Sequence, residues 1–236
     1  MRRSGVAATM AATAVLAGCA SGHPAVVQWV DATASAGGTS MRLCTMRARG
    51  VTEQVAAKDG TAAVERLDAS TANAPTFEVT ATFDTPTEIA ADPDRIRRHH
   101  AEQVGALYRR AAVALRAPPR GYTDVVGALN ASGSWLESRN GGRFAWLCSD
   151  GLDRRLLRLP VIDRAHVERL LRRLRQLRQI PRLHGATVVF DTTSSTARDR
   201  LGPSEQQAVE FFYRALVREG GGHVGGFGTG TRLPLR

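Results

Sequence analysis

Apolar and polar positions along the chain follow two patterns, one typical of buried strands and the other of amphipathic helices. The run VVQWV at 26–30 is β-branched, aromatic and uncharged, which predicts a strand buried on both faces. RFAWLCSD at 143–150 and GATVVFD at 185–191 have the same character. Runs that are apolar on both faces are typical of parallel sheets covered by helices.

Two further runs predict neighbouring strands. AAVERLDAS at 62–70 and FEVTATFD at 77–84 are separated by TANAPT, which has turn composition. In the second run the apolar side chains alternate, which predicts that Phe77, Val79, Ala81 and Phe83 share one face. A connection this short predicts an antiparallel pair at one edge of the sheet.

Helical periodicity fills the segments between these strands. We expect helices over about 40–58, 93–117, 124–136, 164–178 and 204–222. Asp92, Asp163 and Ser204 are predicted to cap three of them. Strands that alternate with helices predict an α/β fold: a three-layer, doubly wound, mostly parallel sheet with one antiparallel edge strand and helices on both faces.

The N-terminal segment has the layout of a secretory signal. Arg2 and Arg3 precede an apolar stretch over 6–16 that is too short for a stable membrane span. The closing LAGC, residues 16–19, resembles a bacterial lipobox, which implies that 1–18 is cleaved and that Cys19 carries lipid. The alternative is a plain signal peptide whose cleavage site happens to contain a cysteine.

By this interpretation the mature chain has three parts. Residues 19–25 are a lipidated tether, 26–220 form one domain, and 221–236 are a Gly-rich tail that is either loose or holds one short strand. The expected location is the extracytoplasmic face of the cell membrane, held by the N-terminal lipid.

Charge and cysteine usage leave two questions open. The net charge of +10 comes almost entirely from arginine, since Lys58 is the only lysine. This bias reflects either a GC-rich genome or attraction to anionic lipid or wall polymers, for which the Arg-rich helix 164–178 is the candidate surface and a solvated helix face the alternative. No aromatic-basic pattern indicates nucleic-acid binding. Cys44 and Cys148 either form a disulfide or are buried separately.

Oxygen-bearing side chains follow the predicted strands at their carboxyl ends. Asp31, Thr33 and Ser35 come after the first strand, Thr123 and Asp124 lie at a helix start, and Ser149 and Asp150 come after RFAWLC at 143–148. Ligands bind at this edge of an open parallel sheet, and hydroxyl and carboxylate oxygens suit Mg²⁺ or Mn²⁺. The alternative is that these side chains only cap helices and form turns.

Three short segments resemble the von Willebrand factor A (VWA) family. DATAS at 31–35 looks like its Asp-x-Ser-x-Ser element, GYTDVVGAL at 121–129 like its Thr-bearing loop, and FAWLCSDG at 144–151 like its strand ending in Thr/Ser-Asp-Gly. The resemblance covers about residues 26–220 and implies a metal-ion-dependent adhesion site (MIDAS).

In such a site, by resemblance, the hydroxyls of Thr33, Ser35 and Thr123 bind the ion directly. Asp31 and Asp150 act through water and hydrogen bonds, and an acidic side chain of a protein partner completes the coordination. The chain departs from the family pattern in three places: Thr33 replaces serine, Ala36 replaces a bulkier residue, and Asp191-Thr192-Thr193 replaces a glycine-rich turn.

The sequence therefore predicts an envelope lipoprotein that binds a protein partner through a divalent ion and is not an enzyme. One alternative is a structural lipoprotein with a metal-free form of the same fold. The other is an enzyme, for which a magnesium-dependent phosphoester hydrolase that reuses Asp31 and Asp150 is the candidate form. Catalysis is disfavoured because no serine sits in a Gly-x-Ser-x-Gly elbow, no histidine occupies a convincing base position, and no carboxylate pair at a cleft is evident.

Overall fold

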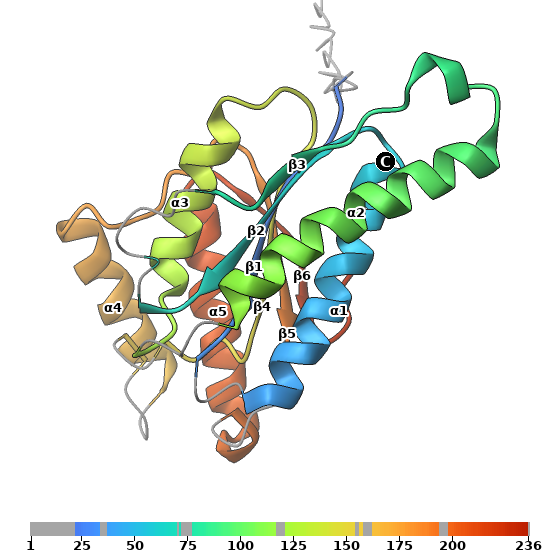
Figure 1. Cartoon of the computed structure of the whole chain (residues 1–236). Coiled ribbons are helices and arrows are strands. Elements are labelled where there is room, and N and C mark those ends of the chain that lie inside the picture. The colour runs from blue at the N-terminus through green and yellow to red at the C-terminus, as the bar shows by residue number, and fades with distance from the viewer. Residues whose placement is uncertain are drawn as a thin grey trace, which may run out of the picture.

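The computed structural model describes residues 22–33, 37–69, 71, 77–116, 121–153, 156–157, 162–193 and 198–235, which form a sheet flanked by helices (Figure 1). The strands are β1 (Ala25–Asp31), β2 (Thr61–Leu67), β3 (Thr80–Thr82), β4 (Arg143–Ser149), β5 (Thr187–Thr192) and β6 (His223–Gly228). The helices are α1 (Gly37–Ala56), α2 (Pro93–Leu115), α3 (Val125–Glu137), α4 (Arg164–Gln176) and α5 (Pro203–Glu219), with 3₁₀ turns η2 (Thr87–Ile89) and η3 (Arg198–Arg200).

The strand order is β3-β2-β1-β4-β5-β6, and every pair is parallel except β2–β3. Helices α1 and α2 pack on one face of the sheet, and α3, α4 and α5 pack on the other (Figure 1). The predicted fold class, a doubly wound and mostly parallel sheet with one antiparallel edge strand, is confirmed. None of the helices in the described part of the chain has the length and hydrophobicity of a membrane span.

Strand β1 is buried along its whole length because helices cover both of its faces. Trp29 faces α3 and donates a hydrogen bond from Nε1 to Ser132 Oγ at 2.8 Å. Gln28 faces the other helix layer, where its amide donates to Thr52 Oγ1 at 2.6 Å and accepts from Tyr108 Oη at 3.0 Å. The two polar groups inside β1 are thus paired with helix residues, which favours one arrangement of these helices.

The helix starts agree with the predicted capping residues in two cases and differ in one. Asp92 accepts from the backbone N–H groups of Asp94 and Arg95, and Asp163 accepts from that of His166. The predicted cap at Ser204 is wrong, because α5 already begins at Pro203 and Gly202 is its N-cap.

The alternation predicted for 77–84 holds only in part. Val79, Ala81 and Phe83 pack in the core beneath α1 and α2. Phe77 has a positive φ of 49°, which turns the chain before β3 begins. Its ring therefore reaches the opposite core and lies 6.0 Å from Trp29 between ring centroids. The predicted common face for all four side chains is wrong because regular strand geometry starts only at Thr80.

The segment assigned to a Gly-rich tail contributes to the sheet. β6 pairs in parallel with β5, and Leu233 beyond it is buried in the core beneath α1 and α2. Gly230 and Thr229 bond to the end of β5, through Asp191 Oδ1 at 2.8 Å and the carbonyl of Thr192 at 3.1 Å. The folded unit therefore continues past Gly220.

Glu65 in β2 is an acidic side chain in an unfavourable position. Its Oε1 is buried and makes no hydrogen bond to the described part of the chain. Burial and repulsion from Glu78 raise the pKa of Glu65 from 4.5 to about 7. The folded state therefore holds the carboxyl proton of Glu65 more tightly than the unfolded state does. The stability that protonated Glu65 contributes is complete below pH 4.5 and is lost as the pH rises through 7.

The Glu65→Gln variant is expected to remove this pH dependence. Near pH 4.5 its free energy of unfolding should match that of the wild type, and near pH 8 it should be higher by roughly 2 kcal/mol. This is less than the full pKa difference corresponds to, because solvent screens the partly buried side chain. Urea unfolding at a series of pH values measures the difference. Glu102→Gln, on the exposed side of α2, is the control and should give a constant difference. A Glu65→Gln difference that is equally constant would contradict the prediction.

Candidate metal centre

The candidate site lies at the carboxyl ends of β1 and β4, where the strand order reverses. From β1 the order continues to β2 and β3, and from β4 it continues in the opposite direction to β5 and β6. In open α/β sheets this reversal leaves a crevice in which ligands bind. Asp31 is the last residue of β1, and Ser149 is the last residue of β4.

Asp31 is fully buried and accepts hydrogen bonds from three segments of the chain. Its Oδ1 accepts from the backbone N–H of Thr33 at 2.9 Å and from Thr33 Oγ1 at 2.7 Å. Its Oδ2 accepts from Ser149 Oγ at 2.5 Å and from Thr123 Oγ1 at 3.3 Å. The hydroxyl oxygens of Thr33 and Thr123 lie 3.4 Å apart. Residues far apart in the sequence therefore meet at one carboxylate.

Thr123 reaches this point because Asp124 fixes the start of α3. Asp124 Oδ1 accepts from the backbone N–H of Gly127 at 2.9 Å. A Cβ at Gly127 would come within 2.4 Å of Asp124 Oδ2, so a larger residue there would require the Asp124 side chain to shift. The signal for this arrangement was visible in the sequence, since Asp is a favoured N-cap residue.

Asp150 directly follows β4 and is 1% exposed. Its Oδ1 accepts from the backbone N–H of Leu152 at 2.9 Å. Its Oδ2 is buried and has no hydrogen-bond partner among the residues that the structure describes. The backbone carbonyl accepts from Arg198 Nη1 at 2.8 Å. A buried carboxylate oxygen without a partner is costly, and a cation or a water molecule would offset that cost.

The electrostatics of the site centre on Asp31. Burial raises the pKa of Asp31 above its ordinary value, whereas hydrogen bonds from Ser149 and Thr33 lower it in part. The carboxylate of Asp150 lies near enough to add to the rise. A bound cation would favour the ionised form of Asp31, because an opposite charge at close range lowers a carboxyl pKa.

The structure brings Asp31, Thr33 and Thr123 together and places Asp150 beside them. Ser35 and Cys19 lie outside the described residues. Ser149 was not in the predicted ligand set, although its place directly before Asp150 at a strand end was a usable signal.

Asp191 marks the chain's departure from the VWA pattern at the end of β5. Its Oδ1 accepts from Arg47 Nη1 of α1 at 2.8 Å and from the backbone N–H of Gly230. Burial raises the pKa of Asp191, and both of these contacts oppose the rise. Nearby, the hydroxyl of Thr193 is buried without a hydrogen bond to any described residue. No sequence pattern indicated the pairing of Arg47 with Asp191, because 144 positions separate them.

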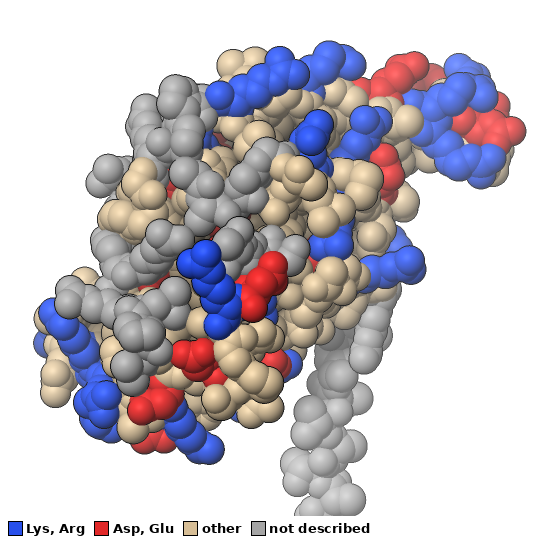
Figure 2. All heavy atoms as spheres, turned by 90° about the horizontal axis from the view of Figure 1, so that it is seen from below, with Lys and Arg blue, Asp and Glu red and all other residues tan. Residues whose placement is uncertain are grey.

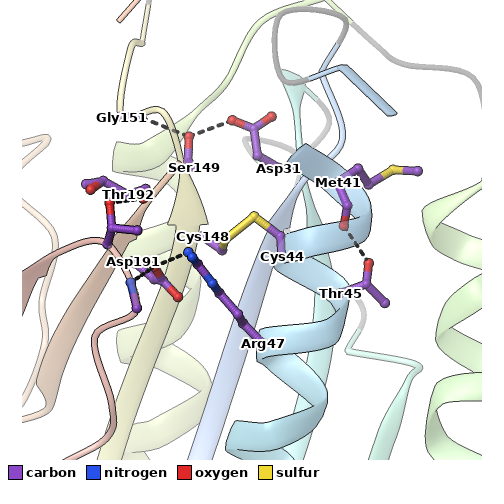
Figure 3. The surroundings of a disulfide bond; sticks show 12 residues. Asp31, Met41, Cys44, Thr45, Arg47, Cys148, Ser149, Gly151, Asp191 and Thr192 are labelled. Carbon is purple, nitrogen blue, oxygen red and sulfur yellow. Dashed lines mark hydrogen bonds and ion pairs between the residues drawn. A yellow bond between two sulfur atoms is a disulfide. The ribbon is translucent and has the colours of Figure 1, made fainter. Parts of the chain in front are cut away.

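Cys44 and Cys148 form a disulfide between α1 and β4 (Figure 3). Of the two alternatives that the sequence left open, the structure has the paired one. The bond lies next to the candidate site, because Cys148 immediately precedes Ser149 in β4. In Figure 3, the disulfide lies below the hydrogen-bonded pair of Asp31 and Ser149, at the same end of the sheet.

Among the described residues, no three His, Cys, Asp or Glu side chains come together as a metal site. The donors gathered here are of another kind: hydroxyls of Thr33, Thr123 and Ser149 around the carboxylate of Asp31, with the carboxylate of Asp150 nearby. These are hard oxygen ligands, and they fit Mg²⁺ or Mn²⁺ rather than Zn²⁺. Figure 2 views this end of the molecule, where basic and acidic side chains both reach the surface.

Comparisons with known proteins add no family assignment. No protein-family model and no curated protein matches the sequence. The manganese-loaded TRAP protein of Plasmodium vivax is similar over 85% of this chain, with 14% identity and a TM-score of 0.38, and this chain spans 64% of that one. An aerotolerance-related membrane protein from Bacteroides fragilis, with multiple mutations to serine, is similar over 89% of this chain and 91% of its own, with 10% identity and a TM-score of 0.39. Because the sequence identities and TM-scores of both proteins are low, the fold class is assigned from the strand order of the sheet and the helix layers alone.

Proposed function

We propose that this chain is an exported, lipid-anchored protein whose domain binds a partner protein through Mg²⁺ or Mn²⁺. The observation that carries the proposal is the convergence of Thr33, Thr123 and Ser149 on the buried carboxylate of Asp31, at the reversal point of the sheet. The resemblance of these segments to the VWA family supports the same site.

The hydrogen-bond directions suit a cation. The hydroxyls of Thr33, Thr123 and Ser149 donate to Asp31, so the acceptor side of each oxygen would face a metal. Ser149 Oγ also accepts from the backbone N–H of Gly151 at 3.1 Å, which leaves it one lone pair for the ion. Asp150 would contribute its Oδ2, which has no hydrogen-bond partner among the described residues, directly or through water. A divalent ion held mainly by neutral hydroxyls keeps much of its charge, which would attract an acidic side chain of the partner.

Binding is favoured over catalysis by the same contacts. Within the described residues, no histidine hydrogen-bonds to the site hydroxyls, and these hydroxyls direct their protons to Asp31. A nucleophilic serine or threonine needs a nearby base that is oriented to accept its proton. The buried carboxylate of Asp31 is a poor candidate for that base, because three hydroxyls share it.

Export is supported by the disulfide, since buried disulfides persist mainly in oxidising compartments. The lipobox resemblance at 16–19 would place the lipid on Cys19. The exposed arginines of α4, including Arg169, Arg172 and Arg173, would add contacts with anionic lipid.

Calorimetric titration with Mg²⁺ and Mn²⁺ tests the metal site. The wild type is expected to bind one ion, and Asp150→Asn is expected to bind about 10- to 100-fold more weakly, because the buried Oδ2 is replaced by an amide. Asp199→Asn, an exposed acid in η3, is the matched control and should bind like the wild type.

Each alternative has its own outcome in this experiment. A wild type that binds neither ion would support the metal-free structural protein. Turnover of a generic phosphoester that depends on added Mg²⁺ would support the hydrolase. Equal affinity of Asp150→Asn and wild type would place any metal somewhere other than this site.

A further inference from the structure

The Cys44–Cys148 disulfide joins α1, which begins four residues after Thr33, to β4, which carries Ser149 at its end. Cys148 lies one residue before Ser149 and two before Asp150. Cys44 lies in the first half of α1, which begins directly after the segment 34–36 that carries Ser35. The two cysteines are 104 positions apart in the sequence, and their Cα atoms are 5.6 Å apart.

The bond is well protected and does not stand alone. Cys44 and Cys148 are 1% and 0% exposed and belong to the core beneath α1 and α2. Farther along α1, Arg47 pairs with Asp191 at the end of β5 at 2.8 Å. Both contacts hold the middle of α1 against the carboxyl ends of neighbouring strands, as Figure 3 shows.

We propose that this disulfide positions the candidate metal centre. It holds α1 against the end of β4, and because α1 begins four residues after Thr33, the bond limits how far Thr33 can move from Ser149 and Asp150. This inference rests on the proposed function, because it concerns the same metal site. It goes further by making metal affinity depend on a bond that contacts no ligand.

The physical reason is preorganisation. A single hydroxyl ligand binds a divalent ion weakly. The affinity of the whole site therefore depends on whether its ligands are already in position before the ion binds. Supporting residues around a metal site typically change its affinity 10- to 100-fold. Without the bond, α1 is expected to move relative to β4, and part of the binding energy is then spent on restoring the position of Thr33 relative to Ser149 and Asp150.

A merely structural role makes a different prediction. A disulfide that closes a long loop stabilises a protein chiefly by restricting the unfolded chain. Such an effect lowers the melting temperature when the bond is removed. It leaves the metal affinity of molecules that are still folded unchanged. The two roles therefore separate when affinity is measured well below the melting temperature of every variant.

The test measures the Mn²⁺ dissociation constant by calorimetry for three proteins. The first is the oxidised wild type, the second is Cys44→Ala/Cys148→Ala, and the third is Val55→Ala. Val55 is fully buried in the same core, later in α1, so its truncation weakens the fold without touching the disulfide. If that variant does not fold, wild type that is unfolded in urea, reduced with a phosphine and refolded with the phosphine present replaces it.

We expect Mn²⁺ to bind about tenfold more weakly when the disulfide is absent and with unchanged affinity in Val55→Ala. Equal affinity with and without the disulfide in folded protein overturns the inference and leaves the proposed function intact. An equal loss in Val55→Ala also overturns it, since affinity would then follow stability. Absence of Mn²⁺ binding to the oxidised wild type overturns the proposed function and this inference together.

Discussion

Replacement of Asp31 by asparagine is expected to weaken Mg²⁺ and Mn²⁺ binding about 100-fold. Asp31 accepts four hydrogen bonds, from the backbone N–H and hydroxyl of Thr33 on one oxygen and from the hydroxyls of Ser149 and Thr123 on the other. Asparagine has the same shape but presents a donor at one of these positions. At least one hydroxyl must then turn its proton away from residue 31 and lose an oxygen lone pair to the change.

In Asp31→Asn the free energy of unfolding should change much less than the metal affinity. Burial disfavours the charged form of Asp31, so a neutral amide is not expected to lower the stability of the metal-free protein by more than about 1 kcal/mol. Calorimetry for metal and urea unfolding in EDTA measure the two quantities. Asp84→Asn, an exposed acid distant from this end of the sheet, serves as the control. An Asp31→Asn protein that binds Mg²⁺ normally would remove Asp31 from the site.

The second large effect is expected on folding, from Gly133→Ala. Gly133 lies inside α3, where the segment between α4 and β5 crosses the helix. A Cβ there would lie 1.7 Å from the carbonyl oxygen of Arg182 and 2.8 Å from its carbonyl carbon. These are backbone atoms, and the segment is tied in place by the hydrogen bond from Leu183 N to the carbonyl of Gly220 at 2.8 Å.

Alanine is the best helix former, so local propensity alone would make Gly133→Ala stabilising. The tertiary clash should reverse the sign, with a loss of about 3 kcal/mol and a melting temperature lower by about 10 °C. Ser134→Ala, the exposed neighbour in the same helix, should change stability by less than about 0.5 kcal/mol. Calorimetric melting of both variants measures the contrast. A Gly133→Ala protein as stable as the wild type would show that the crossing segment can move aside.

Local pattern was sufficient for most of the elements. The buried runs at 26–30 and 143–150 lie in β1 and β4, because an uncharged β-branched and aromatic run has few stable environments other than a covered strand. Asp92 and Asp163 cap helices as predicted, because capping depends on residues within one turn. The start of α5 was misplaced because Pro203 and Ser204 both suit a first turn, and Glu205 bonds back to Gly202 instead.

The candidate site was predicted in outline, and its internal contacts were not. Asp31, Thr33, Thr123 and Asp150 stood out because the carboxyl ends of parallel strands share one edge. Ser149 donates the shortest hydrogen bond to Asp31, and each site hydroxyl directs its proton to that carboxylate. Both features depend on distances between segments about 90 to 120 positions apart in the sequence. Such distances follow from packing and have no local signature.

By itself, the sequence determined the alternation of strands and helices, the end of the sheet at which polar oxygens gather, and the pattern of charge. These follow from periodicity and from the chirality of parallel connections, which act over short stretches. Only the tertiary structure decided that Cys44 pairs with Cys148, that Phe77 crosses to the opposite core, that β6 completes the sheet, and that Gly133 admits no side chain. Each depends on where a distant segment lies, because contact between residues far apart in the chain arises only when both faces of the sheet are packed.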